Sequence, residues 1–342
     1  MKRAVLAAAI ALCGCADKSI EVFQSECDKG ETKSCFDLGD HYERGINVDR
    51  DYVKAAALYE RACDLNYYEA CAKAARLYAF DLTPAFNRTK AETLVKKACD
   101  HNVPQGCGQL SEIYIDGSPI INIEKNETKA FELAMKSCDQ NDAFGCYILG
   151  VIKFDKNATT ERNAEAIKIY AKAANLFKKN CEKGYGIDCF LTNRYYLSKG
   201  ADQNDEKSLL YASKACEAQI GWGCENAAAM YAFGLGVKKD KEKEGFYLEK
   251  SCYFGVSAMC LRLADNYAEG FGGFDKNIPK AIELHNKGCE LGCVYCCSHL
   301  GDLYAKGDEG LKPDEIKAKE FYQKANDIFE SECSLGYASS CN

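Results

Sequence analysis

Cysteine is the residue type that gives this chain its greatest capacity for chemistry, with 22 cysteines in 342 residues. Thiols in such number bind metals in a reducing compartment, whereas an oxidising compartment turns them into disulfides. Eighteen of the cysteines stand in nine pairs whose members are eight residues apart. The pairs are Cys27 with Cys35, Cys63 with Cys71, Cys99 with Cys107, Cys138 with Cys146, Cys181 with Cys189, Cys216 with Cys224, Cys252 with Cys260, Cys289 with Cys297 and Cys333 with Cys341. This regularity favours a crosslinked chain in an oxidising compartment.

Two further cysteines, Cys293 and Cys296, form a Cys-x-x-Cys motif between Cys289 and Cys297. A thioredoxin-type redox motif needs its first cysteine at a helix N-terminus in a βαβ setting, and no such setting is predicted here. A zinc site made of the four cysteines is a second interpretation, which the oxidising compartment argues against. We favour a third, an additional Cys293–Cys296 disulfide or mixed pairing among the four.

The sequence motifs of common hydrolases are absent. There is no Gly-x-Ser-x-Gly, no P-loop, no His-x-x-x-His and no Ser-x-x-Lys. A metallohydrolase needs clustered histidines. The four histidines, His41, His101, His285 and His299, fall in four different repeats of the pattern described below, at unrelated positions. We therefore expect no catalytic residue, no metal site and no cofactor.

The N-terminus predicts export. Met1-Lys2-Arg3 is positively charged, and residues 4–12 form an apolar run too short to span a bilayer, so residues 1–14 read as a signal peptide. Leu12-Cys13-Gly14-Cys15 resembles a bacterial lipobox, which predicts a lipid on Cys15 and a tether over residues 15–24. Ala16 after that cysteine favours an outer-membrane lipoprotein facing the periplasm. The alternative is ordinary cleavage and secretion of a soluble chain.

The cysteine pairs recur with a period near 36 residues, which is typical of helical-hairpin arrays. Apolar residues before each pair recur at helical spacing, and turn formers lie between the cysteines. Each unit therefore reads as a first helix, a turn, a second helix and a loop. We expect repeats near 25–60, 61–96, 97–135, 136–178, 179–213, 214–249, 250–286 and 287–330, with a partial cap at 331–342. Two first helices should be longer than the others, by extra residues within 170–177 and 321–329.

Residues 25–342 resemble the Sel-one-like repeat, a relative of the tetratricopeptide repeat. The pattern Ala-Cys…Cys-x-x-Leu-Gly-x-x-Tyr, seen in Cys35-Phe36-Asp37-Leu38-Gly39-Asp40-His41-Tyr42, is more closely similar to bacterial cysteine-rich Hcp-type proteins. The resemblance implies an all-α superhelical solenoid of about nine repeats, in which each cysteine pair joins the two helices of its hairpin by a disulfide. Residues 79–88 lack the usual glycine loop, and Thr192-Asn193 replaces Leu-Gly, so these units depart from the pattern.

Aromatic residues invite two interpretations. A tyrosine stands seven residues after the second cysteine in most repeats, and we expect these rings to pack between repeats rather than to stack on a ligand. They are Tyr42, Tyr78, Tyr114, Tyr231, Tyr267 and Tyr304. The single tryptophan, Trp222, could anchor a partner, but we favour its packing over the neighbouring hairpin.

The net charge of -7 argues against nucleic acid as a partner, because phosphate binding needs clustered Lys and Arg. The function we predict is a monomeric, exported scaffold that binds proteins or peptides on its concave surface. The ligand could be a cell-wall component or a host protein. The alternative, implied only by the Hcp-type resemblance, is a β-lactamase or penicillin-binding hydrolase acting on the cell wall.

Overall fold

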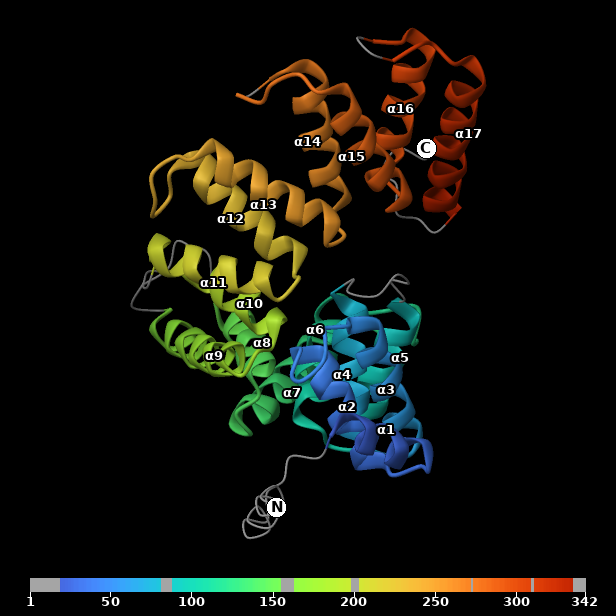
Figure 1. Cartoon of the computed structure of the whole chain (residues 1–342). Helices are drawn as coiled ribbons and strands as arrows, with labels where there is room; N and C mark the ends of the chain where they lie inside the picture. The colour runs from blue at the N-terminus through green and yellow to red at the C-terminus, as the bar shows by residue number, and fades with distance from the viewer. Residues whose placement is uncertain are drawn as a thin grey trace, which may run out of the picture. The chain divides into compact units, whose positions relative to one another are not determined.

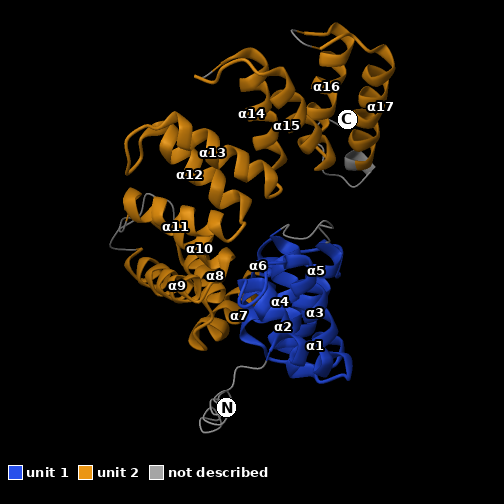
Figure 2. Ribbon diagram, in the orientation of Figure 1, with its two compact units in different colours: residues 1–126 blue, residues 127–342 orange. Residues whose placement is uncertain are grey.

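The computed structural model of the chain describes residues 19–80, 88–154, 163–197, 203–271, 273–308 and 311–334. These residues form α-helices, and their only β-structure is two isolated bridges. The chain divides into two compact units, residues 1–126 and residues 127–342 (Figure 2). The all-α class expected from the sequence is confirmed.

The first unit contains three helical hairpins (Figure 1). Its helices are α1 (Ile20–Asp28), α2 (Thr32–Arg44), α3 (Tyr52–Asp64), α4 (Tyr68–Ala79), α5 (Arg88–Asp100) and α6 (Pro104–Asp116). Each hairpin pairs an odd-numbered with an even-numbered helix, and within this unit α2 also packs on α3, and α4 on α5.

The second unit continues the pattern with five hairpins and a further first helix. Its helices are α7 (Glu127–Asp139), α8 (Ala143–Lys153), α9 (Ala164–Glu182), α10 (Gly186–Leu197), α11 (Asp205–Glu217), α12 (Gly221–Phe233), α13 (Lys241–Tyr253), α14 (Ser257–Glu269), α15 (Ile278–Glu290), α16 (Val294–Lys306) and α17 (Glu315–Ser334). Helix α9 has 19 residues and α17 has 20, against 13 in α11, α13 and α15, so the two longer first helices are confirmed.

The turn inside each described hairpin has one residue with a positive φ, three positions after the first cysteine. Glycine or asparagine fills this position in seven hairpins, since both tolerate left-handed backbone. They are Gly30, Asn66, Asn102, Asn141, Gly184, Gly255 and Gly292. The sixth hairpin has Gln219 there, with φ 61°. The backbone of Gln219 is therefore left-handed, although glutamine tolerates this conformation less well than glycine or asparagine.

Gln219→Gly should raise the free energy of unfolding of the second unit by about 0.5–1 kcal/mol, because glycine removes the left-handed penalty but adds unfolded-state entropy. Ala218→Gly is the matched control. Ala218 precedes Gln219 in the same turn with φ -80°, so glycine should destabilise there. Urea unfolding followed by the fluorescence of Trp222 measures both. A gain from Ala218→Gly, or none from Gln219→Gly, would contradict the argument.

The loop between hairpins contains a set of contacts that recurs in several repeats. An Asp or Asn caps the next first helix by accepting a hydrogen bond from the backbone N–H of a lysine three residues later, as Asp51 does from Lys54. The backbone N–H of the same Asp51 donates to the carbonyl of Tyr42, which closes the loop. Lys54 then lies over the Tyr42 ring, 5.2 Å from its centroid. The same arrangement recurs in Asn204 with Lys207 and Tyr196, and in Asp240 with Lys243 and Tyr231.

The expectation that the repeat tyrosines pack between hairpins is confirmed where ring contacts are found. Tyr231 stacks on Tyr247 of the next first helix with centroids 5.6 Å apart, and Tyr304 stacks on Phe321 at 5.7 Å. Tyr196, which the sequence analysis overlooked, stands at the same position of the fifth repeat and stacks on Tyr211 at 5.8 Å. These contacts join α10, α12 and α16 to the hairpins that follow them.

The Leu-Gly motif explains another contact between hairpins. A Cβ built on Gly39 would lie 2.9 Å from two ring atoms of Tyr59, whose side chain is fully buried. Only glycine lets α2 and α3 approach this closely. In the fifth repeat, Asn193 takes the glycine position and donates to the carbonyl and the hydroxyl of Ser208, at 2.9 Å each. Asn226 donates to the Asn193 side-chain oxygen at 2.6 Å, so a buried polar network replaces the close contact.

Candidate functional site

Disulfides join the first to the second helix of every hairpin in the described part of the chain, in the eight-residue spacing expected from the sequence. The Cα atoms of the eight pairs lie 4.4–4.9 Å apart, at the short end of the range for disulfides. The bonded pairs are Cys27 with Cys35, Cys63 with Cys71, Cys99 with Cys107, Cys138 with Cys146, Cys181 with Cys189, Cys216 with Cys224, Cys252 with Cys260 and Cys289 with Cys297.

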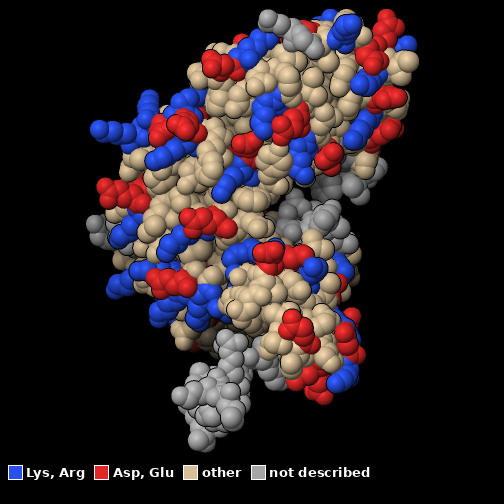
Figure 3. Space-filling model, viewed as in Figure 1, with Lys and Arg blue, Asp and Glu red and all other residues tan. Residues whose placement is uncertain are grey.

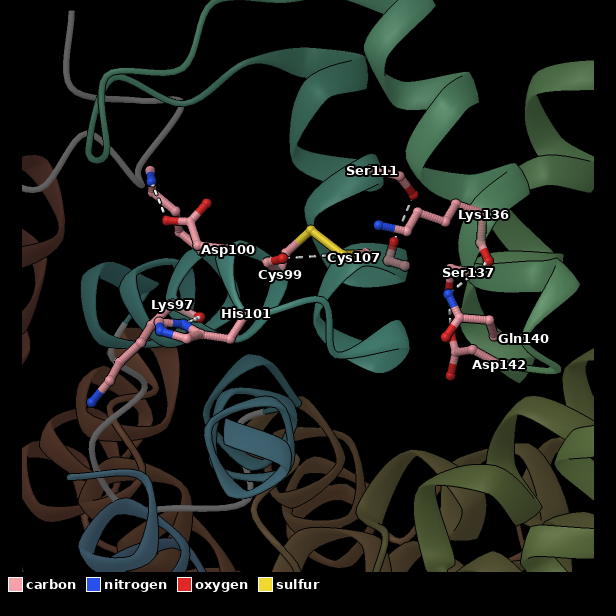
Figure 4. The surroundings of a disulfide bond; sticks show 12 residues. Lys97, Cys99, Asp100, His101, Cys107, Ser111, Lys136, Ser137, Gln140 and Asp142 are labelled. Atoms are coloured by element: carbon pink, nitrogen blue, oxygen red, sulfur yellow. Dashed lines mark hydrogen bonds and ion pairs between the residues drawn. A yellow bond between two sulfur atoms is a disulfide. The ribbon is translucent and has the colours of Figure 1, made fainter. Parts of the chain in front are cut away.

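Figure 4 shows one of these disulfides, in which the sulfurs of Cys99 and Cys107 bridge α5 and α6. Two of the cysteine predictions fall elsewhere in the chain. The predicted ninth pair, Cys333 with Cys341, lies outside the residues whose side chains are described, and so does Cys15 with its predicted lipid. The pairing of Cys333 with Cys341 therefore stays a prediction.

The residues that precede the two cysteines face each other and set this close approach. Ala98 and Gly106 meet in the third hairpin, where an added Cβ on Gly106 would lie 2.5 Å from the Ala98 Cβ. Two hairpins use a hydrogen bond instead. Asn180 donates to Asp188 at 3.0 Å, and the corresponding Ser34 donates to Glu26. Small or mutually bonded residues therefore hold the helices at disulfide distance.

The Cys-x-x-Cys motif forms a further disulfide, between Cys293 and Cys296, with Cα atoms 5.2 Å apart. Cys293 is the N-cap residue of α16, and its sulfur accepts a hydrogen bond from the Cys296 backbone N–H. Cys296 is fully buried against Gly288, at the position that a small residue fills in other hairpins. The extra disulfide thus lies inside the turn and leaves the regular Cys289–Cys297 bond in place.

Two histidines and one aspartate come together in the second unit. The Nδ1 atom of His299 in α16 lies 2.9 Å from Oδ1 of Asp265 in α14. The Nε2 atom of His285 in α15 lies 3.4 Å from the same oxygen. The two rings meet edge to face, with centroids 5.3 Å apart. The expectation that these histidines occupy unrelated positions is wrong, because consecutive helices bring them together.

The environment of this cluster is asymmetric. The side chain of His285 is 1% exposed, whereas those of Asp265 and His299 are 38% and 41% exposed. Burial lowers the pKa of His285 to about 4; nearby Asp265 opposes this shift and His299 adds to it. His285 is therefore neutral at neutral pH, and one of its ring nitrogens keeps a free lone pair. The Nδ1 atom of His285 has no hydrogen-bond partner.

The other residues singled out in the sequence have different partners. The Nδ1 atom of His41 contacts the carbonyl of Ile46 at 2.8 Å, and that of His101 contacts the carbonyl of Lys97 at 2.9 Å. His101 also stacks on Tyr68. Trp222 is 47% exposed, so its expected packing over the neighbouring hairpin is only partial.

Comparison with known proteins identifies the repeat. The family model described as "Sel1 repeat" matches residues 32–67, 69–103, 104–142, 193–220, 217–252, 257–293 and 294–327. The chain belongs to the Sel1 repeat family. The segment without a match, 143–192, includes Thr192 and ends directly before Asn193, where the Leu-Gly pair is replaced.

Two curated proteins match part of the chain. Cytochrome c oxidase assembly factor 7A of Xenopus laevis is 31% identical over 94 residues, which are 27% of this chain and 38% of that protein. Cytochrome c oxidase assembly factor 7 of Xenopus tropicalis is 34% identical over 71 residues, 20% of this chain and 31% of that protein. The chain thus matches only about a third of the length of these relatives.

The chain is also similar to solved structures. A Sel1 repeat protein from Oxalobacter formigenes has a TM-score of 0.49 and 20% identity, covering 92% of this chain and 90% of that one. A protective antigen of uropathogenic Escherichia coli with an SLR fold has a TM-score of 0.43 and 22% identity, covering 94% and 67%. In the described residues, no helix combines the length and apolar character that crossing a membrane requires.

Proposed function

We propose that this Sel1 repeat protein is an exported scaffold that binds proteins or peptides on the concave surface of its repeats. Stacked helical hairpins present extended surfaces of this kind for other proteins. The proposal assigns the surface to the first helices of the hairpins, because in the second unit these carry exposed apolar side chains at corresponding positions. Leu210 in α11 and Phe246 in α13 both stand six residues after the N-cap residue, and each is 50% exposed.

Contacts between neighbouring first helices support one continuous surface. The hydroxyls of Ser213 in α11 and Tyr247 in α13 lie 3.1 Å apart. Further along, Lys280 in α15 forms an ion pair with Glu249 in α13 at 2.7 Å, and Tyr253 donates to Glu283. Helices α11, α13 and α15 therefore lie side by side. We name Leu210, Phe246 and the 44% exposed Tyr253 the first-helix face.

The first-helix face is suited to a protein partner. Aromatic and aliphatic anchors surrounded by polar side chains are typical of protein interfaces. On the face of the molecule shown in Figure 3, positive and negative side chains are interspersed. The disulfides fix each hairpin, so little conformational entropy would be lost on binding. The observation that carries the proposal is the alignment of exposed apolar residues on consecutive first helices.

We also propose export and the cysteine-rich Hcp-type subgroup. The disulfide in each described hairpin supports an oxidising, extracytoplasmic compartment. Residues 1–14 would be the signal peptide, and residues 15–24 a tether with its lipid on Cys15, ahead of the repeats in 25–342. The relatives named above are not described as β-lactamases or penicillin-binding proteins, and we do not propose that activity.

A photo-crosslinking experiment tests the proposed surface. A benzoylphenylalanine replacing Leu210 or Phe246 in the full chain should capture a protein of the cell envelope. The matched controls are Phe233 and Phe271, which are 67% and 69% exposed but lie at the loop end of α12 and α14. Capture at the loop positions only, or at none, would contradict the first-helix face.

The intact mass of the same protein, with or without a diacylglyceryl group on Cys15, tests the anchor.

A further inference from the structure

Asp265, His285 and His299 bring three metal-ligating side chains from α14, α15 and α16 to one point. One ligand atom from each lies within 4.8 Å of the others. The Oδ1 atom of Asp265 is 2.9 Å from Nδ1 of His299 and 3.4 Å from Nε2 of His285. In a tetrahedral zinc site with ligand bonds of about 2.0–2.1 Å, ligand atoms lie about 3.3 Å from one another. The two distances from Oδ1 of Asp265 are already near this spacing, and the two histidine nitrogens lie within 4.8 Å of each other.

The buried histidine gives an independent reason to look for a ligand. His285 is 1% exposed, its Nδ1 has no hydrogen-bond partner, and its Nε2 makes only the 3.4 Å contact with Asp265. Burying a polar group without a hydrogen bond is unfavourable. Asp265 contacts the two histidines and forms no ion pair with a lysine or arginine of the described residues. A cation bound by Oδ1 of Asp265 and Nε2 of His285 would balance the carboxylate and replace this long contact with a bond, whereas Nδ1, on the far side of the ring, would keep its proton.

We propose that Asp265, His285 and His299 bind one divalent transition-metal ion of the zinc type. Two imidazoles and one carboxylate form a ligand set that suits Zn²⁺, and Cu²⁺ or Ni²⁺ with it, better than Mg²⁺ or Ca²⁺. His299 and Asp265 are partly exposed, so solvent or a bound molecule completes the coordination from that side.

The structure also indicates how tightly the ion is held. Strong zinc ligands donate their second ring N–H to an acceptor, and the loss of such a partner weakens metal affinity by about 10–100-fold. The Nδ1 atom of His285 has no acceptor. We therefore expect micromolar rather than nanomolar binding. The ion would join α14 to the hairpin of α15 and α16, and so link two repeats, whereas the disulfides link helices within one repeat.

Zinc titration of the full chain tests the site. The protein carries no histidine tag, its disulfides are intact and its free thiols are alkylated after chelator treatment. Calorimetry should find one Zn²⁺ per chain at neutral pH, and saturating Zn²⁺ should raise the melting temperature by about 5 °C. His299→Gln and Asp265→Asn change partly exposed side chains, which spares the buried His285, and each should weaken binding at least tenfold and abolish the thermal shift. His101→Gln, in the other unit, is the matched control and should bind as the unchanged protein does.

Two results would overturn the proposal. One is the absence of stoichiometric Zn²⁺ binding by the unchanged protein. The other is binding that His299→Gln and Asp265→Asn leave intact, because the ion would then lie elsewhere. Circular dichroism of each variant shows whether it is folded. Neither result depends on whether the first-helix face captures a protein.

Discussion

Replacing both members of one disulfide, Cys216→Ala with Cys224→Ala, should lower the free energy of unfolding of the sixth hairpin by about 2.5 kcal/mol. In the chain-entropy model this is the unfolded-state entropy removed by closing a loop of about nine residues. Both cysteines are buried, at 1% and 0% exposure, so the alanines also leave a small cavity. A hairpin repeat cannot bury a core alone, so a local loss of this size also weakens the neighbouring hairpins of the same unit.

Trp222 makes this loss measurable where it occurs. It lies two residues before Cys224 in the first turn of α12 and is half-buried, so unfolding of its hairpin changes its emission. Urea unfolding of the double variant should show an earlier fluorescence transition. The matched control is Cys63→Ala with Cys71→Ala, which removes an equivalent disulfide from the first unit. We expect that control to alter the circular dichroism transition and to leave the Trp222 transition in place.

Two other outcomes would change the interpretation. An equal shift of the Trp222 transition in both variants would mean that the chain unfolds as one cooperative system. No shift in either would mean that the close packing of Ala215 on Gly223, where an added Cβ would lie 2.5 Å away, already holds the hairpin without its disulfide.

The repeat pattern could be predicted from the sequence because each of its parts has a local cause. The left-handed turn requires Gly30 or Asn66, and the close approach of α2 to α3 requires Gly39. The eight-residue spacing places both cysteines of a pair beside that turn, which is why it matches the disulfides of the described hairpins. The features of the repeat that are set by residues close together in the sequence could therefore be predicted.

The histidine cluster was missed because the two histidines meet only when α15 folds back on α16, and Asp265 of α14 joins them only when the hairpins stack. Asp265 and His299 are 34 residues apart, and the same separation recurs where Lys97 donates to the carbonyl of Cys63 and where Ser213 meets Tyr247. In this sequence, two residues of related chemistry that are 34 positions apart therefore indicate a contact between neighbouring repeats. The Thr192-Asn193 departure from the pattern keeps the contact with the next hairpin, since the buried partners of Asn193 replace what the glycine contact provides.

Gly39→Val should lower the free energy of unfolding around α2 and α3 by about 2–3 kcal/mol, as expected for overpacking a closed contact. The new side chain would enter the ring of Tyr59, which is 0% exposed. That ring has little freedom to move away, because its hydroxyl donates to the buried Glu43 at 2.7 Å. The helices must therefore separate, and the packing between the first two hairpins loosens.

Hydrogen exchange measured by mass spectrometry can detect this loss, because Trp222 does not report on the first unit. Peptides from α2 and α3 should exchange faster in Gly39→Val, while those from α13 and α14 serve as an internal reference. Lys33→Val is the matched control: it places valine in the same helix at a side chain that is 63% exposed, where surface substitutions change stability by about 0.5 kcal/mol. Equal acceleration by both variants would show that valine weakens α2 itself. Acceleration by Gly39→Val alone would show that the glycine of the Leu-Gly motif is required for the contact with the next hairpin.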